Sequence, residues 1–462
     1  MVRLFVSDRI FIDEDLCNGG IVVNNDGKIE EVFKDPIEVE EWLDANSHTE
    51  LYDYTNLVIM PGLIDTHVHI NEPGRTAWEG FETATKAAAA GGFTSLIDMP
   101  LNSIPPTTTV ENLLKKQKAT IGKICTDVGF WGGLVPGNEN ELKKLLQAGV
   151  VGFKCFLCPL SDEYFNSVTE AEVELAMKHL ENTNALVAFH AEKCDDECCD
   201  VDENNGDIHD FKTYLKTRPA SLELNAIEMI TRVAQKYNSV RMHIVHLSSA
   251  DALPLIKKCR EIVGNRLTVE TCHHYLNFTA DDIPQKGVEF KCCPPIRDAN
   301  NQKQLWNALK SRDINMVVSD HSPCPPELKF LTDGPDFGNM MKSFCGISSV
   351  QFGLSVFWTS CEKHNMDISD MVHLMSVEPA KMCGFENRKS KLAKGYDADM
   401  CIWDPSGEFV VTPDIVHFRH KANPYMGKKL KGLVHATIVR GNFAYRRSDR
   451  EIFNFVGQML LK

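Results

Sequence analysis

Short apolar runs alternate with segments of helical periodicity through the middle of the chain, and this alternation limits the possible fold more than any other feature. The strand-like runs are Leu57–Met60, Thr94–Met99, Val128–Phe130, Gly149–Phe153, Leu186–Phe189, Met242–Val245, Leu267–Glu270 and Met316–Val318. Helical patterns lie between them, for example Phe81–Ala90, Glu139–Gln147 and Glu170–Glu181. About eight βα units over roughly 270 residues fit a (β/α)8, TIM-type barrel. A doubly wound open sheet would need a glycine-rich phosphate loop after its first strand, and none is present there, so we predict the barrel.

The two ends of the chain have a different pattern, made of short strands joined by turns. The strand-like segments there are Leu4–Val6, Gly20–Val23, Ile29–Phe33, Asp399–Trp403 and Val434–Val439. The turn Asn25-Asp26-Gly27 between two alternating runs is a hairpin signal. We therefore expect both ends to build one small β-sandwich beside the barrel. The predicted division places residues 1–58 and 391–462 in the sandwich and residues 59–390 in the catalytic barrel.

Charge and cysteine content exclude several classes of protein. A formal net charge of −15, with no basic patch or arm, argues against a nucleic-acid partner. No apolar run reaches the ~20 residues that a membrane span needs. The sixteen cysteines are scattered and no signal peptide precedes them, so we expect reduced thiols in an intracellular compartment, the cytoplasm first. The acidic stretch with Cys194, Cys198 and Cys199 is interpreted as a solvated loop rather than a zinc knuckle, since only His209 offers a further ligand nearby.

Metal-binding side chains recur where the predicted barrel strands end. His67 and His69 are two residues apart, so the period-2 geometry of a strand points both imidazoles to the same side. Four further residues each end another strand: Lys154, His190, His246 and Asp320. The chemistry of such barrels lies at the carboxyl ends of several strands. Four imidazoles and a carboxylate suit a borderline metal such as Zn²⁺.

Each of these residues has a structural alternative when it is taken alone. A single strand-end histidine, such as His243 or His274, is more often a hydrogen-bonded core residue. A single lysine usually extends to solvent or pairs with a carboxylate. The ordered set is what favours a metal centre. Lys154 fits such a set because a buried lysine can lose its proton, and the neutral amine can add CO₂ to form a carbamate whose two oxygens can bridge two metals.

The whole pattern resembles the cyclic amidohydrolases, a family that includes allantoinases, dihydroorotases and dihydropyrimidinases or hydantoinases. The resemblance runs from about Pro61 to Pro379 and extends to the segment Gly395–Asp399. It implies two divalent metal ions per subunit, zinc first, bridged by Lys154 as N6-carboxylysine. It further implies that His67, His69 and Asp320 hold one metal and that His190 and His246 hold the other. A homotetramer is the assembly that this resemblance implies.

The resemblance also implies a reaction, the hydrolytic opening of a cyclic amide. Metal coordination lowers the pKa of bound water to about 7 and polarises a carbonyl group. Asp320 is the expected proton shuttle, passing the proton of the attacking water to the departing ring nitrogen. No nucleophilic serine or cysteine is needed, so Cys155 and Cys158, which flank the bridging lysine, are interpreted as packing residues.

The residues after the second histidine discriminate among substrates. Dihydroorotases usually carry an arginine two residues later to pair with the substrate carboxylate, and Asn71 stands there in this chain. Dihydropyrimidinases have a tyrosine shortly after the lysine, whereas Tyr164 lies ten residues on. The remaining signatures resemble the allantoinase branch, in the segments Asn71–Thr76, Asp98–Ser103, Gly152–Cys158 and Cys292–Arg297. They imply a neutral hydantoin ring with a ureido group, (S)-allantoin, opened to allantoate in purine and ureide catabolism.

Hydrogen-bonding groups for such a substrate are predicted at Asn102, Cys293 and Gly346, although a strand-end asparagine is more often a cap or turn residue. One departure from the family is His273, which stands where a proline is common before the His-Tyr pair and leaves the role of His274 open. Three alternatives stay open. These are dihydropyrimidinase or hydantoinase activity, dihydroorotase activity, and a non-catalytic scaffold that kept the barrel.

Overall fold

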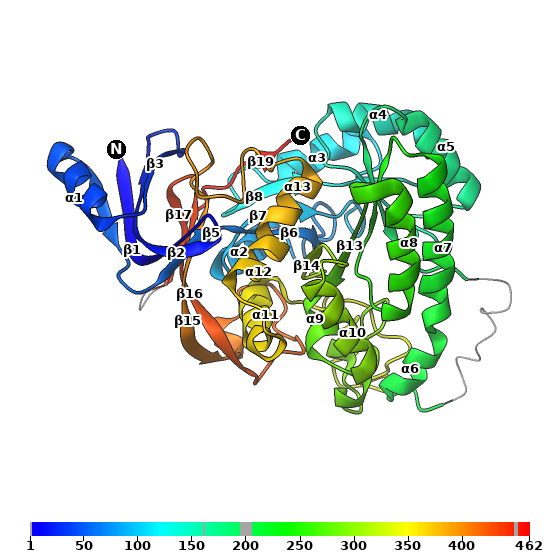
Figure 1. Cartoon of the computed structure of the whole chain (residues 1–462). Helices are drawn as coiled ribbons and strands as arrows, with labels where there is room; N and C mark the ends of the chain where they lie inside the picture. Colours follow the sequence, from blue (N-terminus) through cyan, green and yellow to red (C-terminus); the bar gives the residue numbers. More distant parts are fainter. Residues whose placement is uncertain (1, 160–161, 195–205, 448–450) are drawn as a thin grey trace.

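The computed structural model describes residues 2–159, 162–194, 206–447 and 451–462, and the structural statements below concern these residues. Most of the acidic cysteine-containing stretch, including Cys198 and Cys199, lies outside them. Figure 1 shows two parts, a barrel surrounded by helices and a layer of antiparallel strands at its side, to which the blue amino-terminal and the orange-red carboxyl-terminal segments both contribute.

The barrel predicted from the sequence is confirmed. Its parallel strands, within the described residues, are β6 (Leu63–Val68), β7 (Phe93–Asp98), β8 (Asp127–Phe130), β10 (Phe153–Phe156), β11 (Leu186–His190), β12 (Arg241–Ile244), β13 (Leu267–Cys272) and β14 (Met316–Val318). The short strand β9 (Gly132–Gly133) continues β8 and pairs with β10. A bridge between Val68 and His321, just after β14, joins that strand to β6 and closes the ring of strands. The carboxyl-terminal ends of all these parallel strands therefore lie at one mouth of the barrel.

Helices cover the outside of the barrel because each has one apolar face to bury. The helices are α2 (Phe81–Ala90), α3 (Val110–Ala119), α4 (Glu139–Gln147), α5 (Glu170–Leu180), α6 (Phe211–Thr217), α7 (Ala220–Lys236), α8 (Leu253–Val263), α9 (His273–Asn277), α10 (Ala299–Lys310), α11 (Gly353–Cys361), α12 (Ile368–Val372) and α13 (Glu378–Cys383). The predicted α2 and α4 have the predicted bounds, and α5 is one residue shorter. Helix α5 begins with a capping box between Thr169 and Glu172, which satisfies two free backbone N–H groups.

The two chain ends meet in one sheet, as predicted. Its strands are β1 (Arg3–Ile12), β2 (Asp15–Val23), β3 (Ile29–Phe33), β4 (Glu50–Asp53), β5 (Val58–Pro61), β15 (Met400–Val410), β16 (Lys429–Val439), β17 (Asn442–Arg446) and β18 (Ile452–Phe453). Strand β5 links the halves, pairing with β1 on one side and β15 on the other. Side chains from both halves, such as Phe5, Ile21, Met400 and Ile438, pack in a second apolar core. The helix α1 (Pro36–Ala45) covers the outer end of this sheet.

Two strand predictions need correction. The run Leu57–Met60 is not a barrel strand, because β5 hydrogen-bonds to β1 and β15; the first barrel strand is β6, after Gly62. We therefore keep the three-segment division as a proposal and move its first boundary to Gly62. The run Gly149–Phe153 is also misplaced, since β10 begins only at Phe153 and places Lys154 inside the strand. The carboxyl-terminal tail returns to the barrel, where β19 (Met459–Leu460) pairs with β8.

The described residues also bear on the predictions about membrane spans and free cysteines. No helix among them combines the length and apolar character that a bilayer crossing requires. The fourteen cysteines in the described part of the chain are all free thiols, and most of them are buried.

Candidate metal centre

The six predicted ligands converge at the carboxyl-terminal mouth of the barrel. They come from five strands or the residues directly after them, and all six line one cavity of about 760 Å³. The six residues are His67, His69, Lys154, His190, His246 and Asp320. Each is at most 7 % exposed, so these ionisable side chains are held where water has little access.

Three of these residues are already close enough to share one ion. The ligand atoms of His67, His246 and Asp320 all lie within 4.8 Å of one another. Asp320 Oδ1 is 3.3 Å from His67 Nε2 and 3.4 Å from His69 Nε2, so the carboxylate lies between both imidazoles of the His-x-His pair. The rings of His190 and His246 meet edge to face with their centroids 4.6 Å apart. The group of His67, His246 and Asp320 therefore combines two residues of one predicted metal site with one residue of the other, as expected where two ions share one centre.

The local electrostatics fit a cation bound among neutral imidazoles and carboxylates. Burial lowers the pKa of His69 to about 4 and that of His246 well below its usual value, so both rings are neutral and have a lone pair to donate. Burial opposes ionisation of Asp320, but His67 and His69 hold the pKa of that carboxyl well below its ordinary value. An ionised carboxylate beside neutral imidazoles is the donor set that a divalent zinc-like ion requires.

Lys154 is buried and has no hydrogen-bond partner for its Nζ among the described residues. Burial lowers the pKa of this amine to about 8, although the charges of Asp320 and Glu270 oppose the shift. The amine therefore exists in part as the free base near neutral pH, which is the form that adds CO₂. A buried cation without a partner is costly, and conversion to an anionic carbamate facing cations removes that cost. The side chain fits the bridging role expected from the sequence.

Buried carboxylates orient the histidines, and the sequence reasoning missed them. Glu270 Oε1 lies 2.5 Å from His67 Nδ1, which leaves Nε2 of that ring facing the cavity. Glu192 Oε2 lies 2.7 Å from His190 Nε2 in the same way. Burial raises the pKa of each carboxyl, but the neighbouring histidines lower both to about 2. Such partners fix the ring orientation and the tautomer that a metal needs. The sequence signal for such a partner was a glutamate inside a buried strand, as at Glu270.

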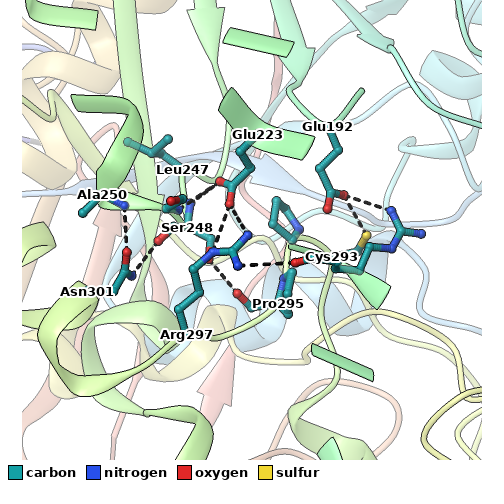
Figure 2. Close-up of polar contacts among 12 residues, drawn as sticks. Glu192, Glu223, Leu247, Ser248, Ala250, Cys293, Pro295, Arg297 and Asn301 are labelled. Atoms are coloured by element: carbon teal, nitrogen blue, oxygen red, sulfur yellow. Dashed lines mark hydrogen bonds and ion pairs between the residues drawn. The ribbon is translucent and has the colours of Figure 1, made fainter. Parts of the chain in front are cut away.

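A second layer of polar contacts holds the loop that carries His246 (Figure 2). Glu223, on α7, forms a buried ion pair with Arg297 at 2.6 Å and accepts the backbone N–H groups of Ser248 and Ser249 at 2.9 and 3.0 Å. His246 itself has a left-handed backbone, with φ at 38°. Such a conformation is unfavourable for a residue with a side chain and persists where the surroundings impose it. Here Glu270 accepts the backbone N–H of His246 at 3.2 Å, and Glu223 holds the amides of Ser248 and Ser249 that follow it.

Comparison with known proteins identifies the family. Residues 58–444 match the model of the family described as "Amidohydrolase family". The chain belongs to the amidohydrolase family. The match covers the whole barrel and the return of the chain into the outer sheet, and thus all six residues of the metal centre.

The relatives within this family divide into two kinds. The chain is similar in sequence to allantoinases: the mitochondrial allantoinase of Aquarana catesbeiana is 47% identical over 83% of this chain and 76% of its own, and the allantoinase of Saccharomyces cerevisiae is 39% identical over 100% and 99%. The allantoinase of Arabidopsis thaliana is 42% identical over 95% of this chain and 87% of its own. Among solved structures, the L-hydantoinase (dihydropyrimidinase) of Arthrobacter aurescens superposes with a TM-score of 0.88 at 27% identity, over 100% of this chain and 99% of its own.

The predicted substrate contacts of this amidohydrolase all line the cavity, yet each is partly engaged elsewhere. The Asn102 amide lies 3.3 Å from His69 Nδ1, so it also orients that histidine. The Cys293 thiol donates to Glu192 at 3.0 Å. The amide N–H of Gly346 donates to the carbonyl of Lys291 at 2.8 Å, so it does not point to a ligand. Asn71 donates to the carbonyl of Pro323 at 3.1 Å instead of facing the cavity.

Three residues outside the predicted ligand set can now be placed. His273 and His274 are buried, and neither ring has a hydrogen-bond partner among the described residues. Cys158 was interpreted as a packing residue, and it is buried; but its thiol also lines the cavity and lies within 4.8 Å of the ligand atoms of His190 and Glu192.

Proposed function

We propose that this amidohydrolase opens the hydantoin ring of (S)-allantoin by hydrolysis and releases allantoate. The observation that carries the proposal is the identity of 34% to 47% with proteins named allantoinase over most of the chain, against 27% or less with the solved hydantoinases. Asn71 in place of a carboxylate-binding arginine supports a neutral ring as the substrate.

The reaction requires two divalent cations in the barrel mouth, for which zinc is our first candidate. His67, His69 and Asp320 would hold one cation, His190 and His246 the other, and Lys154 as N6-carboxylysine would touch both. The carbamate forms when the neutral Lys154 amine adds CO₂ and releases one proton. When bound, such cations supply an acidified water and polarise the carbonyl under attack.

The protein's own residues then handle the proton. Asp320 is ionised and buried within 3.4 Å of both imidazoles of the His-x-His pair, so it can accept the proton of the attacking water. The same carboxyl donates that proton to the ring nitrogen as the C–N bond breaks, which returns Asp320 to its ionised form. Ser322 donates a hydrogen bond to Asp320 Oδ1 at 2.9 Å and fixes the direction of the carboxyl.

The remaining cavity wall would bind the ureido group. Asn102, Cys293 and Tyr214 line the cavity, and the Tyr214 hydroxyl, which donates to the carbonyl of Cys292 at 2.9 Å, keeps its oxygen as an acceptor. Allantoin offers several N–H donors and carbonyl acceptors, so a wall of mixed polar groups recognises it better than a purely basic one. Buried polar groups left unpaired by a smaller ring such as dihydrouracil would disfavour that substrate.

A substrate panel tests the proposal directly. Metal-reconstituted protein is assayed with allantoin, dihydroorotate, dihydrouracil and hydantoin, and the value of kcat/KM is expected to be highest for allantoin. Faster hydrolysis of dihydrouracil would overturn the substrate and leave the reaction class standing. Metal content below one ion per chain in a preparation that hydrolyses none of the four rings would favour a non-catalytic scaffold instead.

Two further parts of the proposal concern the assembly and its location. We propose a homotetramer, by analogy with the family, and a reducing compartment such as the cytoplasm, because the described cysteines are free thiols. Light scattering of the purified protein checks the first part, and fractionation of cells checks the second.

A further inference from the structure

A second group of metal-binding side chains lies in the cavity wall next to the metal centre. The ligand atoms of Cys158, His190 and Glu192 are all within 4.8 Å of one another, and the three residues are buried. Cys293 joins them, because its thiol lies 3.0 Å from Glu192 Oε2 (Figure 2). Three of the ligands are thus already grouped, and Cys293, at the edge of the group, can complete a set of two thiols, one imidazole and one carboxylate, the donors typical of zinc and related thiophilic cations.

An independent observation at this group also indicates a missing ligand. Glu192 is fully buried, and its Oε2 accepts hydrogen bonds from the His190 ring, the Cys293 thiol and the Arg218 guanidinium. Its other oxygen, Oε1, has no hydrogen-bond partner within the described part of the chain. A buried carboxylate oxygen without a donor is uncommon, since its desolvation is uncompensated. A cation or a donor is therefore expected to fill this position under some condition.

The position of His190 allows this group to act separately from the catalytic centre. Its Nε2 faces Glu192, and its ring also contacts His246. An imidazole has two nitrogens, so one can face the catalytic centre while the other faces the Cys158 side. Occupation of both nitrogens requires loss of the ring N–H proton, and it replaces the hydrogen bond to Glu192 that orients the ring for the catalytic metal.

Arg218 determines how tightly a cation can bind there. Its guanidinium lies 3.2 Å from Glu192 Oε2 and reaches the Cys158 thiol, so it already supplies positive charge to the group. An incoming cation must displace it, and the arginine side chain, 29% exposed, has room to turn toward solvent. The group is thus expected to be empty at low metal concentrations and to fill when a thiophilic cation is in excess.

We propose that Cys158, His190, Glu192 and Cys293 form an inhibitory site for a thiophilic divalent cation, such as Cd²⁺ or excess Zn²⁺. On binding, the two thiols and the Nε2–H group of His190 each release a proton to the solvent, and each forms one bond to the cation, with no oxidation or reduction. The loss of activity that follows rests on the proposed function, whereas the binding itself does not.

The test is a titration of the metal-loaded enzyme with Cd²⁺, followed by the ultraviolet absorption of the cadmium–thiolate bond and by activity. The six catalytic ligands include no thiol, so exchange of Cd²⁺ into that centre gives no such absorption. We expect about one equivalent of Cd²⁺ to produce the band, with activity lost over the same range. Each variant is compared with its own uninhibited rate.

Three variants of the site and one matched control make the assignment specific. Cys158→Ser and Cys293→Ser should each lower the absorption by about half and raise the inhibitory Cd²⁺ concentration at least tenfold. The matched control, Cys324→Ser, removes a buried thiol outside this cavity and should change neither. Arg218→Ala should act in the opposite direction and lower the inhibitory concentration, because it removes the competing charge.

The outcomes separate this site from the proposed function. An unchanged absorption band and unchanged inhibition in both cysteine variants would overturn the site. A full band in a protein that hydrolyses none of the four rings would support the site and overturn the proposed function. Since a serine variant that fails to fold would be uninformative, the stoichiometry of the band in the parent protein is measured first, and the absence of any band there also overturns the proposal.

Discussion

Replacement of Glu223 by glutamine tests whether the buried ion pair beneath the His246 loop positions that histidine. In the folded protein Glu223 pairs with Arg297 and accepts two backbone N–H groups from Ser248 and Ser249. Glutamine keeps the size of the side chain and one acceptor oxygen, but it removes the negative charge. The guanidinium of Arg297 then lies buried without a counterion, next to the loop that begins at His246.

The magnitude follows from the burial of the pair. Removal of one partner from a buried ion pair costs about 3–5 kcal/mol of stability. Glu223 and Arg297 are 2% and 10% exposed, and both backbone N–H groups bond to one oxygen, Oε1, which glutamine can retain, so we expect the lower end, about 3 kcal/mol. A domain with ~5–15 kcal/mol of stability stays folded after this loss. If about 1.4 kcal/mol of this lost free energy opposes the metal-binding orientation of His246, the affinity of that site for metal drops about tenfold.

The assay measures retained metal and thermal unfolding in parallel. Glu223→Gln is dialysed against graded metal buffers and its metal content is determined, with the expectation that one of two ions leaves at about tenfold higher free concentration than in the parent. The matched control is Asp127→Asn, which breaks an equally buried cluster with Lys389 and Arg440 at the start of β8, at the opposite end of the barrel. Both variants should melt earlier. Equal retention of metal by the two variants would refute a positioning role for Glu223.

The remaining predictions concern Lys154, Glu270, the bound metal and His273. Lys154→Ala should lose activity by at least a thousandfold and bind fewer metal ions, and short carboxylic acids should partly restore activity, as measured by initial rates with and without acetate or propionate; full activity in Lys154→Ala would end the two-metal account. Glu270→Gln should lower metal affinity through His67 about tenfold, as measured by competition with a chelating dye, while the secondary structure stays unchanged. Removal of metal by a chelator should lower Tm, since ligand in thousandfold excess over its Kd contributes about 4 kcal/mol. Burial lowers the pKa of His273 to about 3, so below pH 6.5 the unfolded chain binds a proton that the folded chain does not, and stability should fall by about 1.4 kcal/mol per pH unit toward pH 3; His273→Leu should reduce this slope in denaturant titrations.

The sequence predicted the barrel, and it placed six candidate ligands that the fold brings to one cavity, because both depend on local periodicity. A strand places every second side chain on one face, and a parallel barrel brings the carboxyl ends of its strands to one mouth. His67 and His69 satisfy the first rule, and His190, His246 and Asp320 satisfy the second. The misplaced run Leu57–Met60 shows the limit of this reasoning. A buried apolar run is the same in a barrel and in a neighbouring sheet, and only its pairing with β1 and β15 decides between them.

The carboxylates that orient the histidines could not be predicted in the same way. Glu192, Glu223 and Glu270 are spread along the chain. Glu223 and Glu270 act on partners far away in the sequence, whereas Glu192 contacts its near neighbour His190. In sequence Glu192 and Glu223 resemble any charged residue near the end of a strand or helix, and only Glu270 has a local signal, its place inside a buried strand. What distinguishes them is complete burial, which the surrounding fold decides.

The backbone of the metal centre explains why these distant partners are needed at all. His246 and Asp320 both adopt left-handed backbone conformations, with φ of 38° and 44°. Each such conformation costs about 1–3 kcal/mol in a residue with a side chain, so neither would persist from local preference alone. Glu223 fixes the amides that follow His246, and Asp65 accepts the backbone N–H of Ser319 at 3.1 Å, directly before Asp320. The chain thus identifies its ligands through local spacing, whereas their exact direction depends on buried charges contributed by other elements.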